Sequence, residues 1–512
     1  MITARTIGTN GRAGNQLFQV AFLLAQSKQR GVKIGWRKWE YAQYFQGDFS
    51  PTITPMAKTI IEPVFNYTPE FYDSLDWSQD LDFHGYFQSE KYWQGCEDEI
   101  RAAFAFKPEF LEAVTAKNPS SGRERIAIHV RRGDYVGNAN YHQLTPLYYL
   151  SALERHFHDW RQCDLLFFSD DAAYVKLNFG CLPNAQFPQG SEIEDLALMT
   201  LCERHIIANS SFSWWGAWLS GSTQVVRPTN HFAGKLTGRC DIQDLYPTEW
   251  AAHTAERLDF NDTTFMYPVS HDSDDRVKNL ALSFDYLRTN IDANFKVCEH
   301  SGDAFAWAEQ FADYTQFNGA QFWRTHMLNN MARQSTTPFI VNMDADVVFP
   351  LAQLLEAVHA LRNGAAVVYP YSGRFVRVQR NWFRALMDSL DVGILSGVRF
   401  PKLRPADMDS VGGCIFFDRK AFWQGGGENE NMVSFTPDDR ERFERFKKLG
   451  FNVVRIAGNL WHMEHYCGVD SGIRNPDYKA GQLEFAKVVG MNAEQLGRYV
   501  ETWEWAKQAI EA

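Results

Sequence analysis

The sequence predicts an α/β protein that is built from two successive α/β units. Residues 1–250 alternate short apolar, strand-like runs with stretches of helical spacing, as a doubly wound sheet requires. A second alternation of the same kind starts at residue 263 and continues toward the carboxyl terminus. The chain has 512 residues, of which 45% are hydrophobic and 22% charged, which is enough for about three globular domains with large cores.

The first unit opens with a glycine-rich turn at residues 11–15, which leads into a helix whose apolar positions follow helical spacing. A buried strand is predicted at residues 126–130, and the loop-like residues 117–122 indicate a boundary between two subdomains near 108–122. Residues 244–250 look like the end of the unit. Residues 251–262 lack strong apolar periodicity and are expected to form a linker.

The second unit is predicted to run from residue 263 to residue 512. It starts with a short strand at 263–267, a helix at 277–287 and a further strand at 294–298. Residues 339–348 form a buried strand that runs into acidic residues, and the following amphipathic helix is closed by Gly364. Asn492 and Gln495 have the spacing of a capping box and begin an amphipathic helix near the carboxyl terminus.

The net charge of −11 argues against nucleic acid and anionic membrane surfaces as partners. The eight cysteines are far apart and form no Cys-x-x-Cys pair, which is typical of reduced thiols in a cytoplasmic protein. The amino terminus has no secretion signal, and no run of residues is long and apolar enough to form a transmembrane segment. A cytoplasmic location is expected, and peripheral attachment to the inner face of a membrane is compatible with the sequence.

The most informative motif is His129-Val-Arg-Arg-Gly-Asp-Tyr135, which directly follows the predicted strand at 126–130. Open α/β sheets bind ligands at the carboxyl ends of their strands. Arginine is well suited to phosphate oxygens because its planar guanidinium donates two hydrogen bonds at once. The motif therefore indicates a diphosphate site. A solvated charged turn is the alternative if the motif is taken alone.

Four further segments accompany this motif along the chain, at residues 11–21, 85–93, 167–171 and 209–219. In this order the five segments closely resemble the bacterial α-1,2-fucosyltransferase family, which uses GDP-fucose without a metal cofactor. The resemblance covers residues 4–250, and five ordered motifs make it specific. It implies a GT-B-like pair of Rossmann-type subdomains that transfers fucose to O2 of a galactose-type residue.

The resemblance also implies roles for individual residues. Arg131 and Arg132 hold the diphosphate, and Arg131 is the residue expected to be essential. His129 reaches the nucleoside, the Gly14-Asn15 turn lies against the donor, and Asp170 or Asp171 accepts hydrogen bonds from guanine. Hydroxyl groups that contact phosphate or sugar come from three serines: Ser210, Ser211 and Ser213.

Structural alternatives stay open for several of these residues. Asn15 is also a plausible helix cap, and His129 a hydrogen-bonded core histidine. The tryptophans Trp214, Trp215 and Trp218 fit core packing better than a platform for sugar. Asp134 and His142 are both candidates for the base of fucosyl transfer, although an aspartate beside two arginines should be strongly acidic and a weak base.

Asp344-Ala-Asp346 is the metal-site candidate of the second unit. The Asp-x-Asp pattern occurs four times in the chain, but only this one ends a continuous apolar strand, so both carboxylates are expected at a sheet edge. Oxygen ligands in this position suit Mn²⁺ or Mg²⁺ bound to a nucleotide diphosphate.

Three segments follow these aspartates in order: Gly412-Gly413, the acidic pair Asp438-Asp439, and Trp461-His-Met-Glu-His465. Residues 263–475 thereby resemble metal-dependent GT-A glycosyltransferases, in particular inverting galactosyl- and N-acetylgalactosaminyltransferases of bacterial polysaccharide synthesis. The resemblance implies a single Rossmann-like domain that binds a UDP-sugar.

The same resemblance implies the site residues of the second unit. Asp346 is the main metal ligand, Asp344 contacts ribose or metal, and His462 or His465 completes the metal site. Asp438 or Asp439 is the base, and this sequence has an aspartate pair where the family often has glutamate–aspartate. Gly412, Gly413 and Arg276 are expected near the UDP-sugar.

Alternatives remain here as well. Asp438 and Asp439 also fit an acidic first helical turn that complements the helix dipole. Each of the two histidines has a non-ligand alternative, and Arg276 fits a surface arginine nearly as well as a nucleotide contact.

The sequence therefore predicts a bifunctional glycosyltransferase of bacterial surface-polysaccharide synthesis. Its substrates are GDP-fucose, a UDP-sugar that supplies galactose or N-acetylgalactosamine, and an oligosaccharide or lipid-linked glycan acceptor. The main alternative is one active glycosyltransferase whose other half is a non-catalytic glycan- or nucleotide-binding module. A purely structural assembly protein is the least favoured interpretation.

Overall fold

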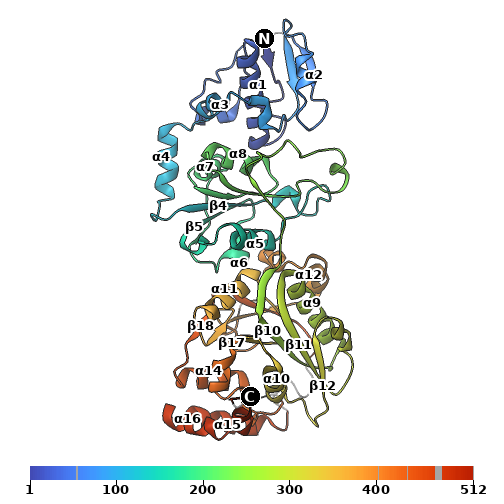
Figure 1. Cartoon of the computed structure of the whole chain (residues 1–512), viewed down its shortest axis with the longest axis vertical. Helices are drawn as coiled ribbons and strands as arrows, with labels where there is room; N and C mark the ends of the chain where they lie inside the picture. The colour runs from blue at the N-terminus through green and yellow to red at the C-terminus, as the bar shows by residue number, and fades with distance from the viewer. Residues whose placement is uncertain (53–55, 402, 435, 467–474, 511–512) are drawn as a thin grey trace. The chain divides into compact units, whose positions relative to one another are not determined.

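The computed structural model describes residues 1–52, 56–401, 403–434, 436–466 and 475–510. The chain divides into two compact units (Figure 1). Unit 1 comprises residues 1–175 and 183–255, and unit 2 comprises residues 176–182 and 256–512. Both are α/β structures with parallel strand pairs, as the sequence predicts.

The first part of unit 1 contains a three-stranded parallel sheet with the order β1-β3-β2. Its elements are β1 (Ile2–Thr3), α1 (Ala13–Arg30), β2 (Lys58–Ile61), α2 (Pro69–Asp73), β3 (Leu81–His84), α3 (Glu97–Ala103) and α4 (Pro108–Lys117). Helix α1 is almost completely buried along its length, because Leu17, Phe18, Val20 and Ala21 all face the core. It ends at Gly31, whose φ of 66° gives the left-handed cap.

The second part of unit 1 is a six-stranded, fully parallel sheet with the order β6-β5-β4-β7-β8-β9. Its elements are β4 (Arg125–Val130), α5 (Pro146–His156), β5 (Asp164–Ser169), α6 (Ala172–Phe179), β6 (Ala185–Gln186), α7 (Glu192–Met199), β7 (Arg204–Ile206), α8 (Ser211–Ser220), β8 (Gln224–Pro228) and β9 (Ala251–His253). All six residues of β4 are buried. A strand that is covered on both faces reads as a continuous apolar run rather than an alternating one.

The core of unit 1 is rich in aromatic rings. Trp214, Trp215 and Trp218 on α8 are at most 4% exposed, and they pack with Phe18 and Trp93. The interpretation of these tryptophans as core residues is therefore confirmed.

Residues 251–262, expected as a linker, consist mostly of strand. Strand β9 pairs with β8 through Ala251, and β10 (Leu258–Ser270) begins five residues after β9 ends. The buried side chains of Leu258 and Phe260 alternate with the exposed Asp259, which is the pattern of a strand with one covered face. This alternation is too short to stand out in the sequence.

Unit 2 is built on a seven-stranded mixed sheet with the order β12-β11-β10-β13-β17-β15-β18, in which β17 is antiparallel to both neighbours. The strands are β11 (Ile291–His300), β12 (Asp313–Phe317), β13 (Phe339–Met343), β15 (Val367–Tyr369), β17 (Cys414–Asp418) and β18 (Val453–Arg455). A second, three-stranded sheet contains β14 (Val347–Val348), β19 (Asn459–Met463) and β16 (Arg374–Val378).

The helices of unit 2 include the two amphipathic helices that the sequence predicts. The helices described in unit 2 are α9 (Asp274–Asn290), α10 (Arg324–Gln334), α11 (Leu351–Arg362), α12 (Phe383–Ser389), α13 (Arg419–Gln424), α14 (Asp438–Lys448), α15 (Tyr478–Gly490), α16 (Ala493–Glu501) and α17 (Glu504–Ile510). Gly364 has a φ of 89° just after α11, and Asn492 and Gln495 form the expected capping box of α16. The strand predicted at 339–348 is divided into β13 and β14 by residues 344–346, which carry the two aspartates.

Seven of the eight cysteines have free thiols, and Cys467 lies outside the described residues. In the part of the chain that the structure covers, no helix combines the length and the hydrophobicity that crossing a membrane requires.

Two candidate active sites

Three neighbouring strands of unit 1 end at the same sheet edge. β4 lies between β5 and β7, and all three are parallel. Arg131 directly follows β4, Asp170 follows β5, and Ser210 lies in the turn after β7. The topology therefore brings together residues that are up to 79 positions apart, at the edge where open α/β sheets bind ligands.

The amino termini of α1 and α8 meet at this edge. A Cβ added to Gly14 would lie 2.5 Å from the backbone nitrogen of Phe212, so only glycine allows this approach. The side-chain oxygen of Asn15 accepts hydrogen bonds from Ser211 Oγ and from Gln88 Nε2, each at 2.7 Å. Two helix amino termini pointing into one space create a positive potential that favours an anion.

Arg131 is held between two carboxylates. It forms ion pairs with Asp134 and with Asp170, the latter at 2.7 Å, and its guanidinium lies 5.3 Å from the ring centroid of Tyr135. Its side chain is 13% exposed, whereas that of Asp134 is 56% exposed. Asp134 is therefore the partner that an incoming phosphate displaces more easily.

A cavity of about 600 Å³ opens in front of these groups. Its lining includes Gly14, Asn15, His129, Arg131, Asp170, Ser210 and Ser211, all of which the sequence predicted to contact the donor. The cavity thus collects polar and positively charged groups from both parts of unit 1.

Three predicted donor contacts are not part of the lining as described. The Arg132 guanidinium lies 3.8 Å from the ring centroid of Tyr174, while its backbone nitrogen donates to Asp170. Asp171 accepts a hydrogen bond from the backbone nitrogen of Tyr174 in the first turn of α6. Ser213 is buried within α8. These three residues are close to cavity residues in the sequence. Their side chains nevertheless lie outside the cavity, because neighbouring residues in the chain point in different directions.

The two candidate bases of unit 1 lie in different surroundings. Asp134 lines the main cavity, while His142 lines a smaller one of about 290 Å³. Burial lowers the pKa of His142. The ion pair between Asp134 and Arg131 agrees with the expectation that this carboxylate orients the arginine.

The buried His129 and the partly buried Asp195 are titratable groups in the cavity wall. Burial and the nearby charge of Arg131 lower the pKa of His129 to about 3, so its imidazole is neutral, and Nδ1 has no hydrogen-bond partner among the described residues. Burial, together with the charges of Glu194 and Glu192, raises the pKa of Asp195 to about 7. Asp195 lies on α7 and was not predicted as a site residue.

The candidate metal ligands of unit 2 come together around Asp346. Its carboxylate lies 2.9 Å from Nε2 of His465 and 3.5 Å from Nε2 of His462. One ligand atom from each of the three residues lies within 4.8 Å of the others. His462 belongs to β19, which pairs with β14 directly after Asp346, and this pairing sets the distance. One carboxylate and two imidazoles fit a divalent transition-metal ion such as Mn²⁺ better than Mg²⁺, which prefers oxygen ligands.

Asp344 faces a different group. Its Oδ1 accepts a hydrogen bond from Arg324 at 2.9 Å, and Asp344 is not one of the three clustered ligands. Arg276, which the sequence placed near the nucleotide, lies 3.4 Å from Asp346 and 2.9 Å from Asp272. The positive charges of Arg324 and Arg276 thus offset the negative charges of Asp344 and Asp346, respectively.

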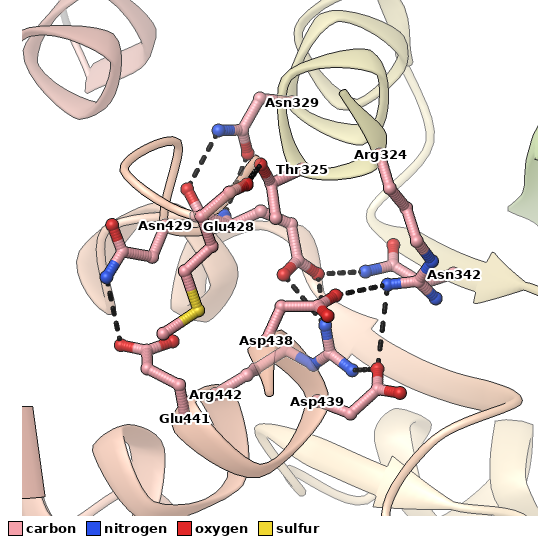
Figure 2. Close-up of polar contacts among 12 residues, drawn as sticks. Arg324, Thr325, Asn329, Asn342, Glu428, Asn429, Asp438, Asp439, Glu441 and Arg442 are labelled. Atoms are coloured by element: carbon pink, nitrogen blue, oxygen red, sulfur yellow. Dashed lines mark hydrogen bonds and ion pairs between the residues drawn. The ribbon is translucent and has the colours of Figure 1, made fainter. Parts of the chain in front are cut away.

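Arg324 also reaches the acidic pair at the start of α14, as Figure 2 shows. Its NH1 lies 2.9 Å from Asp438 and 3.5 Å from Asp439. Arg442 forms a second ion pair with Asp439 and is itself held by the fully buried Glu428 at 2.7 Å. The acidic pair is therefore part of a buried charge network as well as the first turn of a helix.

The two carboxyls of this pair differ in acidity and access. Burial and the charge of Asp439 raise the pKa of Asp438 to about 7. Burial alone would raise the pKa of Asp439 as well, but Arg324 and Arg442 lower it below its ordinary value. The side chain of Asp439 is 34% exposed and that of Asp438 is 12% exposed.

The metal-site candidates also have shifted acidities. Burial opposes ionisation of Asp346, but His462, His465 and Arg276 together hold the pKa of its carboxyl well below the ordinary range. Burial lowers the pKa of His462, whereas the hydrogen bond to Asp346 raises the pKa of His465. A permanently ionised carboxylate beside a neutral imidazole is a suitable start for metal coordination.

Gly412 and Gly413 lie between the metal-site aspartates and the acidic pair. A Cβ on Gly412 would come within 2.3 Å of Asp439 Oδ2, and Gly413 has a φ of 83° while its carbonyl accepts from the backbone nitrogen of Asp344. The backbone conformation therefore favours glycine at position 413, and a side chain at position 412 would displace the Asp439 carboxylate.

Sequence reasoning missed Arg324, Glu428 and Arg442. Arg324 is the first residue of α10 and lies 20 positions before Asp344, and its ion pairs are all between distant segments. The run Gly425-Gly-Gly-Glu428 is a signal that was available, because several glycines before an acid indicate close backbone packing.

Comparison with known proteins supports the reading of unit 1. Residues 2–253 match glycosyl transferase family 11. The O-antigen biosynthesis glycosyltransferase WbnK of Escherichia coli is 31% identical over 191 residues, which are 33% of this chain and 63% of WbnK, less than two thirds of its length. An α-1,2-colitosyltransferase of Escherichia coli is 28% identical over 246 residues, covering 41% of this chain and 85% of that enzyme.

Solved structures give weaker similarities. Drosophila β1,4-galactosyltransferase 7 is 16% identical, covers 39% of this chain and 65% of that chain, and has a TM-score of 0.25. Glucosyl-3-phosphoglycerate synthase of Mycobacterium tuberculosis is 13% identical, covers 46% and 80%, and has a TM-score of 0.29.

Proposed function

We propose that unit 1, whose residues 2–253 match glycosyl transferase family 11, transfers fucose from GDP-fucose to O2 of a galactose-type residue. In this reaction the acceptor O2 forms a bond with C1 of fucose, the bond from C1 to the β-phosphate oxygen breaks, and the proton of the acceptor hydroxyl leaves. GDP departs with an additional negative charge. The catalytic need is therefore to stabilise charge on the diphosphate.

The observation that carries this proposal is the convergence of Arg131 with the amino termini of α1 and α8 on one cavity. Fixed donors aimed at a developing charge lower the barrier without reorganising during the reaction. Arg12 also lines the cavity and adds positive charge. These groups supply the stabilisation that a metal supplies in other transferases, so we propose that unit 1 uses no metal.

For the guanine base we propose Asp195 in place of the predicted Asp170 or Asp171. Asp170 is engaged by Arg131 and by the backbone of Arg132, and Asp171 accepts from the first turn of α6. The carboxylate of Asp195 has no hydrogen-bond partner among the described residues and lines the same cavity. A carboxylate accepts two hydrogen bonds at once and so fits the imino and amino groups of guanine.

For unit 2 we propose transfer of galactose or N-acetylgalactosamine from a UDP-sugar by a GT-A-type domain. Asp346, His462 and His465 would hold a divalent ion, with Mn²⁺ favoured, and the ion would neutralise the diphosphate when bound. Asp344 and Arg276 flank this position and would orient the nucleotide.

The acceptor hydroxyl in unit 2 needs a base, and we propose Asp439. Arg324 and Arg442 lower the pKa of Asp439 and so weaken it as a base, but a base must first reach the acceptor. Asp439 is the more exposed carboxyl of the pair and lies against Gly412. Arg324 and Arg442 fix its direction, and Asp438 holds Arg324 from the other side. Asp438 is thereby assigned the role of a positioning residue.

The two units together would build a surface polysaccharide such as an O-antigen, the process named for the relative WbnK. The domains would be a GT-B-like fucosyltransferase and a GT-A hexosyltransferase. Titration of the full chain with GDP in the presence of EDTA tests the first assignment, which requires binding without metal. Fucosyl transfer that EDTA abolishes would contradict it.

A single active site with a non-catalytic second half is the competing proposal. The charged residues that chemistry needs are present in both units, which disfavours this alternative. Hydrolysis of GDP-fucose and of UDP-galactose, each measured without acceptor, separates the two proposals.

A further inference from the structure

Four aromatic side chains contact one another in a row along the cavity of unit 1. They are Phe65 after β2, Tyr135 and Tyr141 after β4, and Phe232 after β8, and all four line the cavity. The rings of Tyr135 and Tyr141 stack at 4.0 Å, Tyr141 lies 5.9 Å from Phe232, and Phe232 lies 5.2 Å from Phe65. We call these four residues the aromatic wall.

The aromatic wall begins at the proposed phosphate site. The guanidinium of Arg131 lies 5.3 Å from the ring centroid of Tyr135, the first ring of the wall. If Arg131 holds the diphosphate of GDP-fucose, the wall extends from the atom where the fucosyl bond breaks. The molecule that receives fucose must lie next to this atom, so the wall is next to the place where the acceptor has to bind.

The four rings are not packed as core residues are. Each of them is only partly buried, in contrast to the tryptophans of α8. Two contacts nonetheless restrain them: an isolated β-bridge joins the backbones of Tyr141 and Phe232, and the side-chain hydroxyl of Tyr135 donates a hydrogen bond to the carbonyl of Asn209. Half-exposed, rigid aromatic rings on a cavity wall are suited to covering an apolar ligand face.

A pyranose ring offers such a face. In a galactopyranoside the axial O4 lies on one side, which leaves the C–H bonds at C3, C4 and C5 together on the other. The negative face of an aromatic ring attracts these weakly positive hydrogens, while the hydroxyl groups stay available for polar contacts. This geometry leaves O2 at the edge of the stacked sugar.

We propose that the aromatic wall is the acceptor subsite of unit 1 and binds the C–H face of a terminal galactose-type residue. This inference rests on the proposed fucosyltransferase function and adds the residues that select the acceptor. The donor then lies on the side of Arg131 and the two helix amino termini, and the acceptor lies on the aromatic side of the same cavity.

The test uses the full-length protein with Tyr141→Ala and Phe232→Ala, each assayed with methyl β-galactopyranoside and GDP-fucose. We expect the KM for the galactoside to rise about tenfold, since one stacking contact is lost, while the KM for GDP-fucose stays within about twofold. Phe232→Tyr keeps the ring and should restore the parental KM. Tyr44→Ala is the matched control, because Tyr44 is a partly buried ring that contacts Phe110 at 4.9 Å and is not among the residues that line the cavity.

A binding measurement complements the kinetics. In the presence of GDP, saturation-transfer NMR should show magnetisation passing from aromatic protons to H3, H4 and H5 of methyl β-galactopyranoside, and Tyr141→Ala should lose this transfer. Parental acceptor KM values in both alanine variants, with an active parent, overturn the acceptor subsite. An active parent that fucosylates only sugars other than galactosides overturns the acceptor class. A parent that neither binds GDP nor hydrolyses GDP-fucose overturns the proposed function itself.

Discussion

The side-chain oxygen of Asn15 lies 2.7 Å from the hydroxyl of Ser211, although the two residues are 196 positions apart. This hydrogen bond joins the first turn of α1 to the first turn of α8, and both helices begin at the cavity of unit 1. The positive potential that we propose binds phosphate thus depends on two helices, α1 and α8, which follow strands of different sheets and whose amino termini meet at the cavity. Several consequences of this meeting can be measured.

Gly14→Ala should separate the two helix termini. The added Cβ would lie within 2.6 Å of backbone atoms of Ser211 and Phe212, which side-chain motion cannot relieve. We expect GDP affinity to fall by about tenfold or more, and overpacking to destabilise unit 1 by about 1–3 kcal/mol. Calorimetric titration and thermal unfolding measure the two effects. Gly238→Ala is the control, because no atom lies within 4 Å of its added Cβ, and it should leave both values unchanged.

Arg131→Ala should remove fucosyl transfer without unfolding the protein. Truncating one partner of a charged phosphate contact costs about 2–5 kcal/mol, which corresponds to a rate loss of tens- to thousands-fold. Arg131→Lys keeps the charge but loses the forked donor geometry, so we expect an intermediate rate. Transfer rates at saturating GDP-fucose, together with circular dichroism spectra, check this prediction. A folded alanine variant with parental activity would contradict the phosphate assignment.

GDP binding should strengthen as the pH rises through about 7, because Asp195 must lose its proton to accept from guanine and its pKa is raised to about 7. Titrations between pH 5.5 and 8.5, a range chosen to span this pKa by roughly one and a half units, measure the effect. Asp195→Asn should bind GDP more weakly and lose this pH dependence. Unchanged pH dependence in the variant would assign the proton to another group.

The same shift in acidity predicts how stability changes with pH. The pKa of Asp195 in the folded protein is higher than in the unfolded chain, so the folded state keeps a proton that the unfolded state releases between about pH 4 and 7. The contribution of Asp195 to the free energy of unfolding is therefore largest below about pH 4 and is lost as the pH rises through about 7. Comparing the parent with Asp195→Asn by denaturant unfolding across this range isolates the contribution.

Asp439→Asn should reduce hexosyl transfer by about 10²–10⁴-fold, the usual contribution of a general base. Asp438→Asn should have a smaller effect, since it loses one of the contacts of Arg324 but leaves the proposed base in place. The ratio of the two kcat values measures the difference. A larger loss of kcat in Asp438→Asn than in Asp439→Asn would indicate that Asp438 is the base and Asp439 the positioning residue.

The sequence predicted the sheet edges well because a strand end and its neighbouring charged residues are local features. Arg131 after β4 and Asp346 after β13 are in the surroundings expected from apolar runs that end in charged residues. The capping box of Asn492 and the closing Gly364 were likewise local signals. Such features need no knowledge of the tertiary fold.

The direction of individual side chains was not predictable in the same way. Arg132, Asp171 and Ser213 are adjacent to cavity residues in the sequence, but their side chains lie against Tyr174, a helix turn and the core. Arg324 and Asp195 reach the sites from helices whose sequences contain no motif, because long-range packing brings them there. The early part of β10 was missed because its apolar alternation covers only three residues.

The proposed function requires two separate active sites in one chain, and product analysis of two single variants tests this directly. Arg131→Ala and Asp346→Ala are each incubated with GDP-fucose, UDP-galactose, Mn²⁺ and one acceptor, and the masses of the products are measured by mass spectrometry. We predict that Arg131→Ala forms a hexosylated product without fucose. Asp346→Ala should fail to add hexose and should fucosylate a pre-hexosylated acceptor at the parental rate. Loss of hexosylation in folded Arg131→Ala, or loss of fucosylation of the pre-hexosylated acceptor in folded Asp346→Ala, would contradict the presence of two independent sites.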